Sequence, residues 1–91
     1  MTEEKKKYMA KQMAAALPVM RKTLKMKQVD VCERTGVSRS VLSGVESGKR
    51  TLSWDTFLTL VPLFWTNEQT RKLFYAFDMD MDGLQEYLTV K

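Results

Sequence analysis

The sequence predicts an all-α fold in a single domain, and three observations support this class. Apolar residues recur at helical spacing through nearly all of the 91 residues. Strand signals are few, and no repeat or low-complexity tract interrupts the pattern. The length suits one hydrophobic core, near the lower limit at which such a core sustains folding without disulfides or metals.

The composition argues against disulfide or metal cross-links and against membrane insertion. Cys32 is the only cysteine and histidine is absent, so neither an internal disulfide nor the usual zinc ligand sets can form. The longest apolar run, Phe57 to Trp65, falls well short of the ~20 residues that span a bilayer. The first residues are too polar for a secretory signal. We therefore expect a reduced, cytoplasmic protein without metal or cofactor.

Charge is distributed unevenly along the chain. Residues 1–50 contain twelve Lys or Arg and five Asp or Glu, whereas residues 51–91 contain three and six. The cationic part suits a polyanion, and nucleic acid and an anionic membrane surface are both candidates on charge alone.

The N-terminal third predicts two helices separated at a proline. Good helix formers run from Thr2 to Leu17, with Met13 and Met20 on one apolar stripe. Pro18 is expected to open a second helix that ends near Met26, because proline is tolerated at the first helical position and not inside a helix. A single kinked helix is the alternative.

Two short helices follow, joined by a tight turn. The first covers Gln28 to Thr35 and ends at Gly36, where the missing Cβ makes a positive φ inexpensive. Ser38 supplies a side-chain oxygen that caps the second helix, at about 39–46. Gly48 is expected to stop that helix.

Two further helices are predicted beyond residue 50. Ser53 caps the first, and Phe57, Leu60, Val61 and Phe64 form its inner stripe; Pro62 should bend or end it near Val61. Thr66 and Gln69 have the spacing of a capping box that opens the last helix, which carries Leu73, Phe74 and Phe77 on one face.

The acidic stretch Asp78–Gly83 has the D-x-D-x-D-G opening of a calcium-binding loop. The loop needs a bidentate glutamate at its twelfth position, which here is Thr89, and only Val90 and Lys91 remain for the exiting helix. We therefore expect an acidic turn and no calcium site. The segment Leu84–Lys91 could form strand, helix or frayed tail.

The residues around Gly36 follow the spacing of a helix-turn-helix unit, in which two short helices cross steeply around a glycine-centred turn. Counted from Gln28, glycine occupies the ninth position. Apolar or small residues occupy the fourth, fifth, tenth, fifteenth and eighteenth, namely Val31, Cys32, Val37, Leu42 and Val45. The fifth position must be small because the helix axes approach there, so Cys32 is expected to pack and not to react.

With Arg21, "TGVSRS" and "VESGKR", this pattern resembles the phage-repressor and Cro-like helix-turn-helix family, also called the XRE family. The resemblance covers Pro18 to Phe64 closely and extends to Phe77. It implies a compact five-helix repressor-like domain at 17–77, with an N-terminal helical extension at 1–16 and a short C-terminal tail at 78–91. It also implies a structural ion pair between Arg21 and Glu46.

The resemblance implies a sequence-specific regulator that binds double-stranded DNA as a homodimer. A helix fits the major groove, where each base pair presents its own pattern of donors and acceptors. Arg39 is expected to read guanine, and Gln28, Ser38, Lys49 and Arg50 to hold the backbone. The predicted DNA-binding residues are Gln28, Ser38, Arg39, Ser40, Val41, Ser43, Gly44, Lys49 and Arg50. Gly44 departs from the family, because a larger reading residue usually stands there.

Some questions stay open at this stage. Lys5, Lys6, Lys7 and Lys11 could follow the DNA backbone, although a solvated face is favoured. An antitoxin-like protein-interaction module is the alternative function, with a protein partner held by the terminal segments. An enzyme is not expected, since no activated nucleophile or phosphate loop is present. The candidate dimer surface comprises Trp65, Tyr75, Phe77, Leu84, Tyr87 and Leu88, although several of these residues could instead belong to the core.

Overall fold

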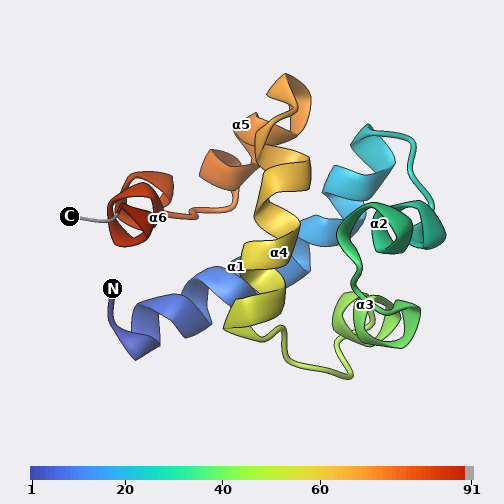
Figure 1. Cartoon of the computed structure of the whole chain (residues 1–91), viewed down its shortest axis with the longest axis horizontal. Coiled ribbons are helices and arrows are strands. Elements are labelled where there is room, and N and C mark those ends of the chain that lie inside the picture. The colour runs from blue at the N-terminus through green and yellow to red at the C-terminus, as the bar shows by residue number, and fades with distance from the viewer. Residues whose placement is uncertain (90–91) are drawn as a thin grey trace.

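The computed structural model describes residues 1–89 and contains helices without strands in that range. The helices are α1 (Glu3–Thr23), α2 (Gln28–Thr35), α3 (Arg39–Glu46), α4 (Trp54–Trp65), α5 (Glu68–Ala76) and α6 (Met81–Leu88). The all-α class is therefore confirmed. Figure 1 shows α1 and α4 crossing at the centre, α2 and α3 at one end, and α6 with the N-terminus at the other.

Helix α1 is continuous through Pro18, so the predicted helix boundary there is wrong and the alternative of one helix holds. Thr2 caps its start by accepting a hydrogen bond from the Lys5 amide. An interior proline costs ~3 kcal/mol. Met13, Leu17 and Met20 are buried on both sides of Pro18, and each such side chain contributes roughly 1.5–3 kcal/mol. Burial of the stripe therefore outweighs the proline.

The end of α1 also differs from the prediction. The helix ends at Thr23 and not near Met26, because Lys25 adopts a left-handed φ of 56°. The amides of Leu24 and Lys25 close the last turn on the carbonyls of Met20 and Lys22. One helix thus replaces the predicted extension at 1–16 and the first helix of the predicted core.

Helix α4 begins where the sequence predicts and ends later. The Ser53 hydroxyl accepts from the Thr56 amide at 3.2 Å, and the predicted inner stripe is buried. The predicted end near Val61 is wrong, since α4 continues past the exposed Pro62 to Trp65. Phe64, which is fully buried, holds this last turn in the core.

The cap of α5 is one residue later than predicted. Asn67, and not Thr66, accepts hydrogen bonds from the amides of Gln69 and Thr70. The Thr66 hydroxyl instead donates to the Pro62 carbonyl oxygen at 2.8 Å, which completes the end of α4. The predicted Thr66–Gln69 capping box is therefore wrong.

The predicted tail is a helix, which was one of the three open alternatives. Asp80 caps α6 by accepting from the Gly83 amide at 2.9 Å. Met79, Met81 and Leu84 are buried in the core, so Leu84 is not part of the candidate dimer surface. Val90 and Lys91, the last residues of the predicted tail, lie outside the described residues.

The core lies between α1, α4 and α5, and α3 packs on the other half of α1. Helix α2 packs on α3 and α4, and Figure 1 shows α2 and α3 together at one end of the molecule. Within residues 1–89, none of the helices is long and apolar enough to cross a bilayer.

Candidate nucleic-acid interface

The turn between α2 and α3 has the geometry that the sequence predicts. Gly36 has φ +80°, and its amide donates to the Cys32 carbonyl oxygen at 2.8 Å. A side chain at this φ would be strained, although the space around the residue is open. Ser38 Oγ accepts from the Val41 amide at 3.2 Å and so begins α3. Three residues thus separate the two helices.

An ion pair holds α3 against α1. Arg21 donates from Nε and Nη2 to the two carboxylate oxygens of Glu46 at 3.0 and 2.8 Å. Its third nitrogen donates to the Met26 carbonyl oxygen at 3.2 Å. The hydrogen bond to Glu46 raises the pKa of Arg21 above its usual value. The Glu46 side chain is only 7% exposed, so this pair fixes the end of α3 in a largely dry site.

Gln28 differs from its predicted surroundings. The residue is half-buried, and its side-chain Nε2 lies 3.3 Å from a Glu46 oxygen, to which it donates. Its amide group is thus turned toward the ion pair at the start of α2, and not fully toward the solvent.

Most of the other predicted DNA-binding residues are exposed to solvent. Ser38, Arg39, Ser40, Ser43, Lys49 and Arg50 are exposed, whereas Val41 and Gly44 are half-buried. Leu42 and Val45 face the core, so the opposite side of α3 faces the solvent. Apart from Arg39, the side chains on this outer face are small.

Gly44 has a packing reason that the sequence did not reveal. A Cβ built on Gly44 would lie 2.7 Å from Cδ and 2.8 Å from Cγ of Arg50. The Arg50 stem therefore crosses α3 where a larger side chain was expected. No sequence signal marks this contact, because residues 44 and 50 belong to different elements.

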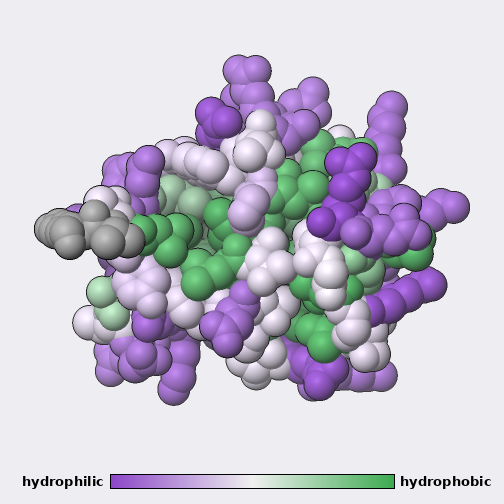
Figure 2. Space-filling model, in the orientation of Figure 1, coloured by the Kyte–Doolittle hydropathy of each residue, from purple (hydrophilic) through white to green (hydrophobic). Residues whose placement is uncertain are grey.

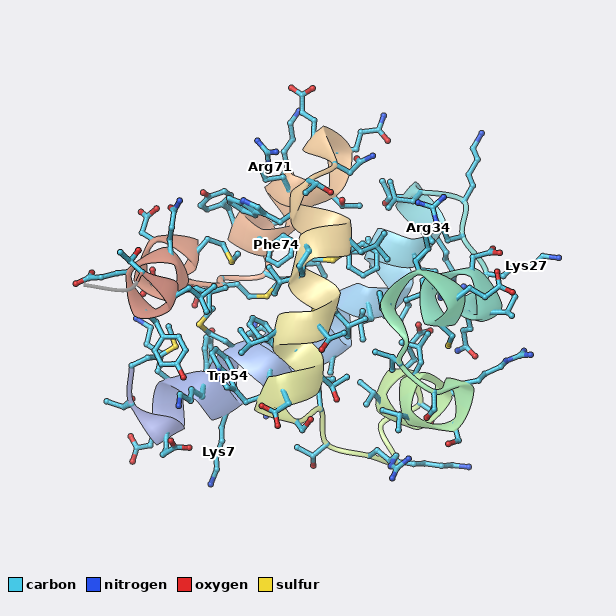
Figure 3. All side chains as sticks on the ribbon, viewed as in Figure 1. Lys7, Lys27, Arg34, Trp54, Arg71 and Phe74 are labelled. Atoms are coloured by element: carbon cyan, nitrogen blue, oxygen red, sulfur yellow. The ribbon has the colours of Figure 1, made fainter. Side chains whose placement is uncertain are left out.

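Two lysines of α1 lie beside the loop that follows α3. Lys7 and Lys11 line a hollow of about 470 Å³ together with Arg50 and Thr51, over an apolar floor that includes Leu52. Figure 3 shows Lys7 extending away from the body of the molecule. Their i, i+4 spacing was the available sequence signal for a shared face, but it did not place that face beside the loop.

Cys32 lies inside the turn unit and packs against the core. Burial raises the pKa of its thiol above the usual value, and the nearby positive charge of Arg39 opposes this shift. The thiol is therefore protonated at neutral pH, as expected of a packing residue.

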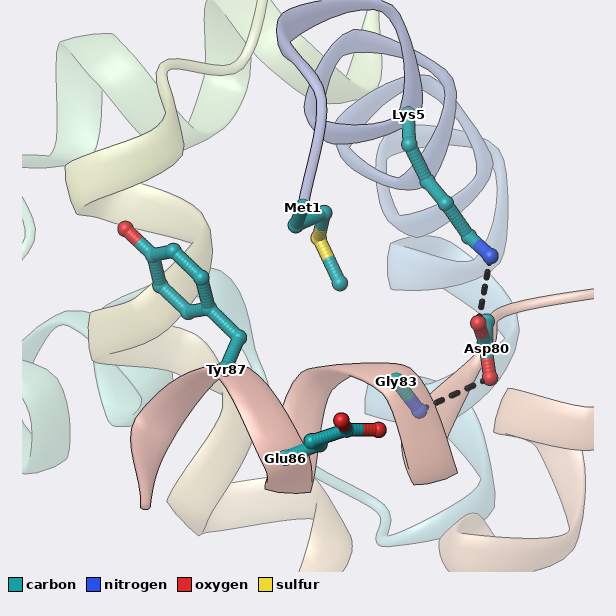
Figure 4. Close-up of a pocket in the computed structure, with 6 residues that line it drawn as sticks. All are labelled: Met1, Lys5, Asp80, Gly83, Glu86 and Tyr87. Atoms are coloured by element: carbon teal, nitrogen blue, oxygen red, sulfur yellow. Dashed lines mark hydrogen bonds and ion pairs between the residues drawn. The ribbon is translucent and has the colours of Figure 1, made fainter. Parts of the chain in front are cut away.

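The carboxylates of Asp78 and Asp80, in the acidic stretch before α6, accept hydrogen bonds from other residues of the protein. One oxygen of Asp80 accepts from the Gly83 amide and the other pairs with Lys5 (Figure 4). Asp78 accepts from the Tyr8 hydroxyl at 2.6 Å. Over residues 1–89, no three Asp, Glu or Cys side chains gather as metal ligands would.

Comparison with known proteins assigns the chain to a family. Residues 12–73 match the family described as helix-turn-helix domain, and this range contains the turn, the ion pair and α3. No curated protein and no solved structure matches the chain. Because the matched range covers well over half of the 91 residues, the chain belongs to the helix-turn-helix domain family.

Proposed function

We propose that this protein is a sequence-specific transcriptional regulator that inserts α3 into the major groove of double-stranded DNA. The observation that carries the proposal is the solvent-facing side of α3, which is exposed at Arg39, Ser40 and Ser43. Membership of the helix-turn-helix domain family supports DNA as the ligand.

Arg39 is the proposed reader of a base on this face. It is the first residue of α3, and the N-terminal part of a recognition helix comes closest to the base edges. A guanidinium can donate to O6 and N7 of guanine at once. Ser40 and Ser43 lie on the same face and can hydrogen-bond to a base or a phosphate, while the half-buried Val41 could contact a thymine methyl.

The flanking residues are assigned to the DNA backbone. Ser38 is the N-cap of α3, and Lys49 lies in the loop that follows its C-cap, Ser47. Contacts from such positions orient the helix and do not distinguish sequences. Gln28 takes part in this role only if its side chain turns away from Glu46 when DNA binds.

Lys7 and Lys11 extend the proposed phosphate-binding surface. They share a hollow with Arg50, whose loop contains Lys49. This location favours the backbone role over a merely solvated face, because cations grouped beside a recognition helix can neutralise consecutive phosphates.

Homodimerisation is part of the proposal, since one helix-turn-helix unit contacts a single half-site. The exposed apolar residues of α5 and α6 are candidates for the dimer surface, namely Tyr75, Tyr87 and Leu88. Trp65 and Leu88 also line an apolar hollow with Met81. Figure 2 shows apolar atoms at the surface near these two helices. Sedimentation of the free protein should give twice the chain mass.

The proposal is tested by selecting bound sites from random duplexes and measuring variants on the selected site. Arg39→Ala should lose ~1 to 3 kcal/mol of binding free energy and relax the preference at one base pair. Lys49→Ala is the matched control, because it also removes one exposed cation from the proposed interface. It should weaken binding to all sequences alike and reduce the salt slope by about one.

Two results would contradict the proposal. One is a selection that enriches no sequence, and the other is an Arg39→Ala variant with unchanged affinity and selectivity.

An antitoxin-like interaction module is the second candidate function, and the apolar hollow beside Leu88 favours it. A protein that copurifies at fixed stoichiometry would support that candidate.

A further inference from the structure

Gly44 lies within α3, where helical geometry does not require glycine. Its φ is not positive, unlike that of Gly36 and Gly48. Glycine inside a helix costs ~1 kcal/mol relative to alanine. A neighbouring side chain that occupies the space of a Cβ offsets this cost.

That neighbour is Arg50, and the backbone holds it in place. The amides of Lys49 and Arg50 both donate to the Gly44 carbonyl oxygen, at 2.9 and 3.1 Å. These bonds fold the connection back over the end of α3. The aliphatic stem of Arg50 then crosses Gly44, with Cβ, Cγ and Cδ at 3.3, 2.8 and 2.7 Å from the position that a Cβ would take.

This crossing determines where the guanidinium lies. The group begins one bond beyond Cδ, so its Nε lies close to Gly44 of α3. Gly44 follows Ser40 by one helical turn, on the same side as Ser43. Within residues 1–89, the Arg50 side chain makes no ion pair and no hydrogen bond, so its five donors are free for a ligand.

We propose that Arg50 is a second base-reading residue, in place of the side chain that Gly44 lacks. Its guanidinium enters the major groove over Gly44 and donates to O6 and N7 of a guanine. This inference rests on the proposed function and changes the assignment of Arg50 from backbone to base.

Arg50 reads a different base pair from Arg39. Residues 39 and 44 are five apart in α3, which corresponds to roughly 7.5 Å along the helix axis. That distance is on the order of two base-pair steps. The selected site should therefore contain two conserved guanines, each dependent on one arginine.

The test measures selectivity of three variants on the selected site and on every single-base change of it. Arg50→Ala should lower the affinity for the selected site roughly 5- to 150-fold. It should abolish the base preference at one base pair, and Arg39→Ala should leave the preference at that base pair unchanged. Arg50→Lys should relax the same base pair although it retains the charge, since lysine lacks the planar fork.

Gly44→Ala supplies the decisive variant. Its added methyl displaces the Arg50 stem while every charge is retained. It should relax the Arg50-dependent base pair without lowering the melting temperature, because alanine favours the helix. Lys49→Ala is the control and should change no base preference. Melting curves and circular dichroism of each variant verify that the fold is intact.

The opposing results separate this inference from the proposed function. If Arg50→Lys and Gly44→Ala keep full selectivity, and Arg50→Ala weakens all sequences alike, Arg50 contacts only phosphate and the inference is wrong while the function stands. If the unaltered protein selects no duplex sequence, the proposed function is overturned and the inference with it.

Discussion

At the scale of single residues, the interface depends on groups whose partners lie far away in sequence. Arg21 and Glu46 are 25 positions apart and form a two-point ion pair with little exposure. Charges in such a site must stay paired, because an unpaired one loses its hydration without compensation. The pair therefore specifies how α3 sits on α1 as well as stabilising the domain.

Removing one partner of this pair should be costly. We expect Glu46→Gln to lower the free energy of unfolding by about 2 kcal/mol or more, because Arg21 keeps its charge in a mostly buried site. Urea denaturation would measure the change. The double variant Arg21→Met/Glu46→Leu should recover much of the loss, since both charges leave together.

The exposed pair between Lys6 and Glu3 provides a matched control. Its carboxylate is 82% exposed, so Glu3→Gln should change the free energy of unfolding by less than ~1 kcal/mol. Equal losses for Glu3→Gln and Glu46→Gln would show that burial of the Arg21–Glu46 pair has no energetic consequence.

At the scale of helices, α6 is attached to α1 by a small set of polar contacts over an apolar base. Asp80 caps α6 and pairs with Lys5 (Figure 4). Gln12 donates to the Phe77 carbonyl oxygen at 2.8 Å, just before α6. The Lys6 ammonium lies 5.0 Å from the centre of the Tyr87 ring. Met81 and Leu84 are the buried residues of α6, and both line an apolar hollow with Val61 and Trp65 of α4.

The capping of α6 should depend on pH. The hydrogen bond from Lys5 and, to a smaller extent, that from the Gly83 amide lower the pKa of Asp80 below its ordinary value of 3.8. A lowered folded-state pKa means that its stabilisation is present above pH 3.8 and is lost as the pH falls through the lower value. Urea denaturation between pH 2 and 7 should show this acid loss, and Asp80→Asn should reduce it.

Two substitutions of Asp80 distinguish the contribution of the helix cap to stability from that of the carboxylate charge. Asparagine still accepts the Gly83 hydrogen bond, whereas Asp80→Ala loses the cap and should cost ~1 kcal/mol at neutral pH. If Asp80→Asn and the unaltered protein had the same acid profile, the Lys5–Asp80 pair would not contribute to the pH dependence.

At the scale of the whole molecule, one end carries the candidate interface and the other joins the two terminal segments. The radius of gyration is 12.4 Å, close to the ~12 Å expected of a compact chain of this length. Helix α1 connects the two ends, since its C-terminal half supports α3 and its N-terminal half receives α6 (Figure 1). Lys7 and Lys11 of α1 lie beside the loop that follows α3.

The proposed phosphate contacts of Lys7 and Lys11 predict a measurable salt effect. Each of Lys7→Gln and Lys11→Gln should weaken binding to all duplexes alike and reduce the slope of log K against log salt by about one, without changing base preference. Titrations between 50 and 200 mM salt would measure the slope. Lys72→Gln is the control, an exposed lysine on α5 outside this hollow. Unchanged slopes for both α1 variants would assign those lysines to a solvated face.

Local signals in the sequence determined much of this protein. The glycine at position 36, the serine caps at 38 and 53 and the apolar stripes act within one or two helical turns, so each could be interpreted without the rest of the chain. These signals also located the turn unit and the outer face of α3.

Contacts between distant segments decided the rest. Pro18 and Pro62 stay inside helices because core burial exceeds their local cost. The acidic tail becomes α6 because Met79, Met81 and Leu84 reach an existing apolar surface and Lys5 meets Asp80. The Arg50 stem over Gly44 depends on how the connection after α3 folds back. These contacts form only when tertiary packing brings the segments together, so the local spacing of residues does not predict them.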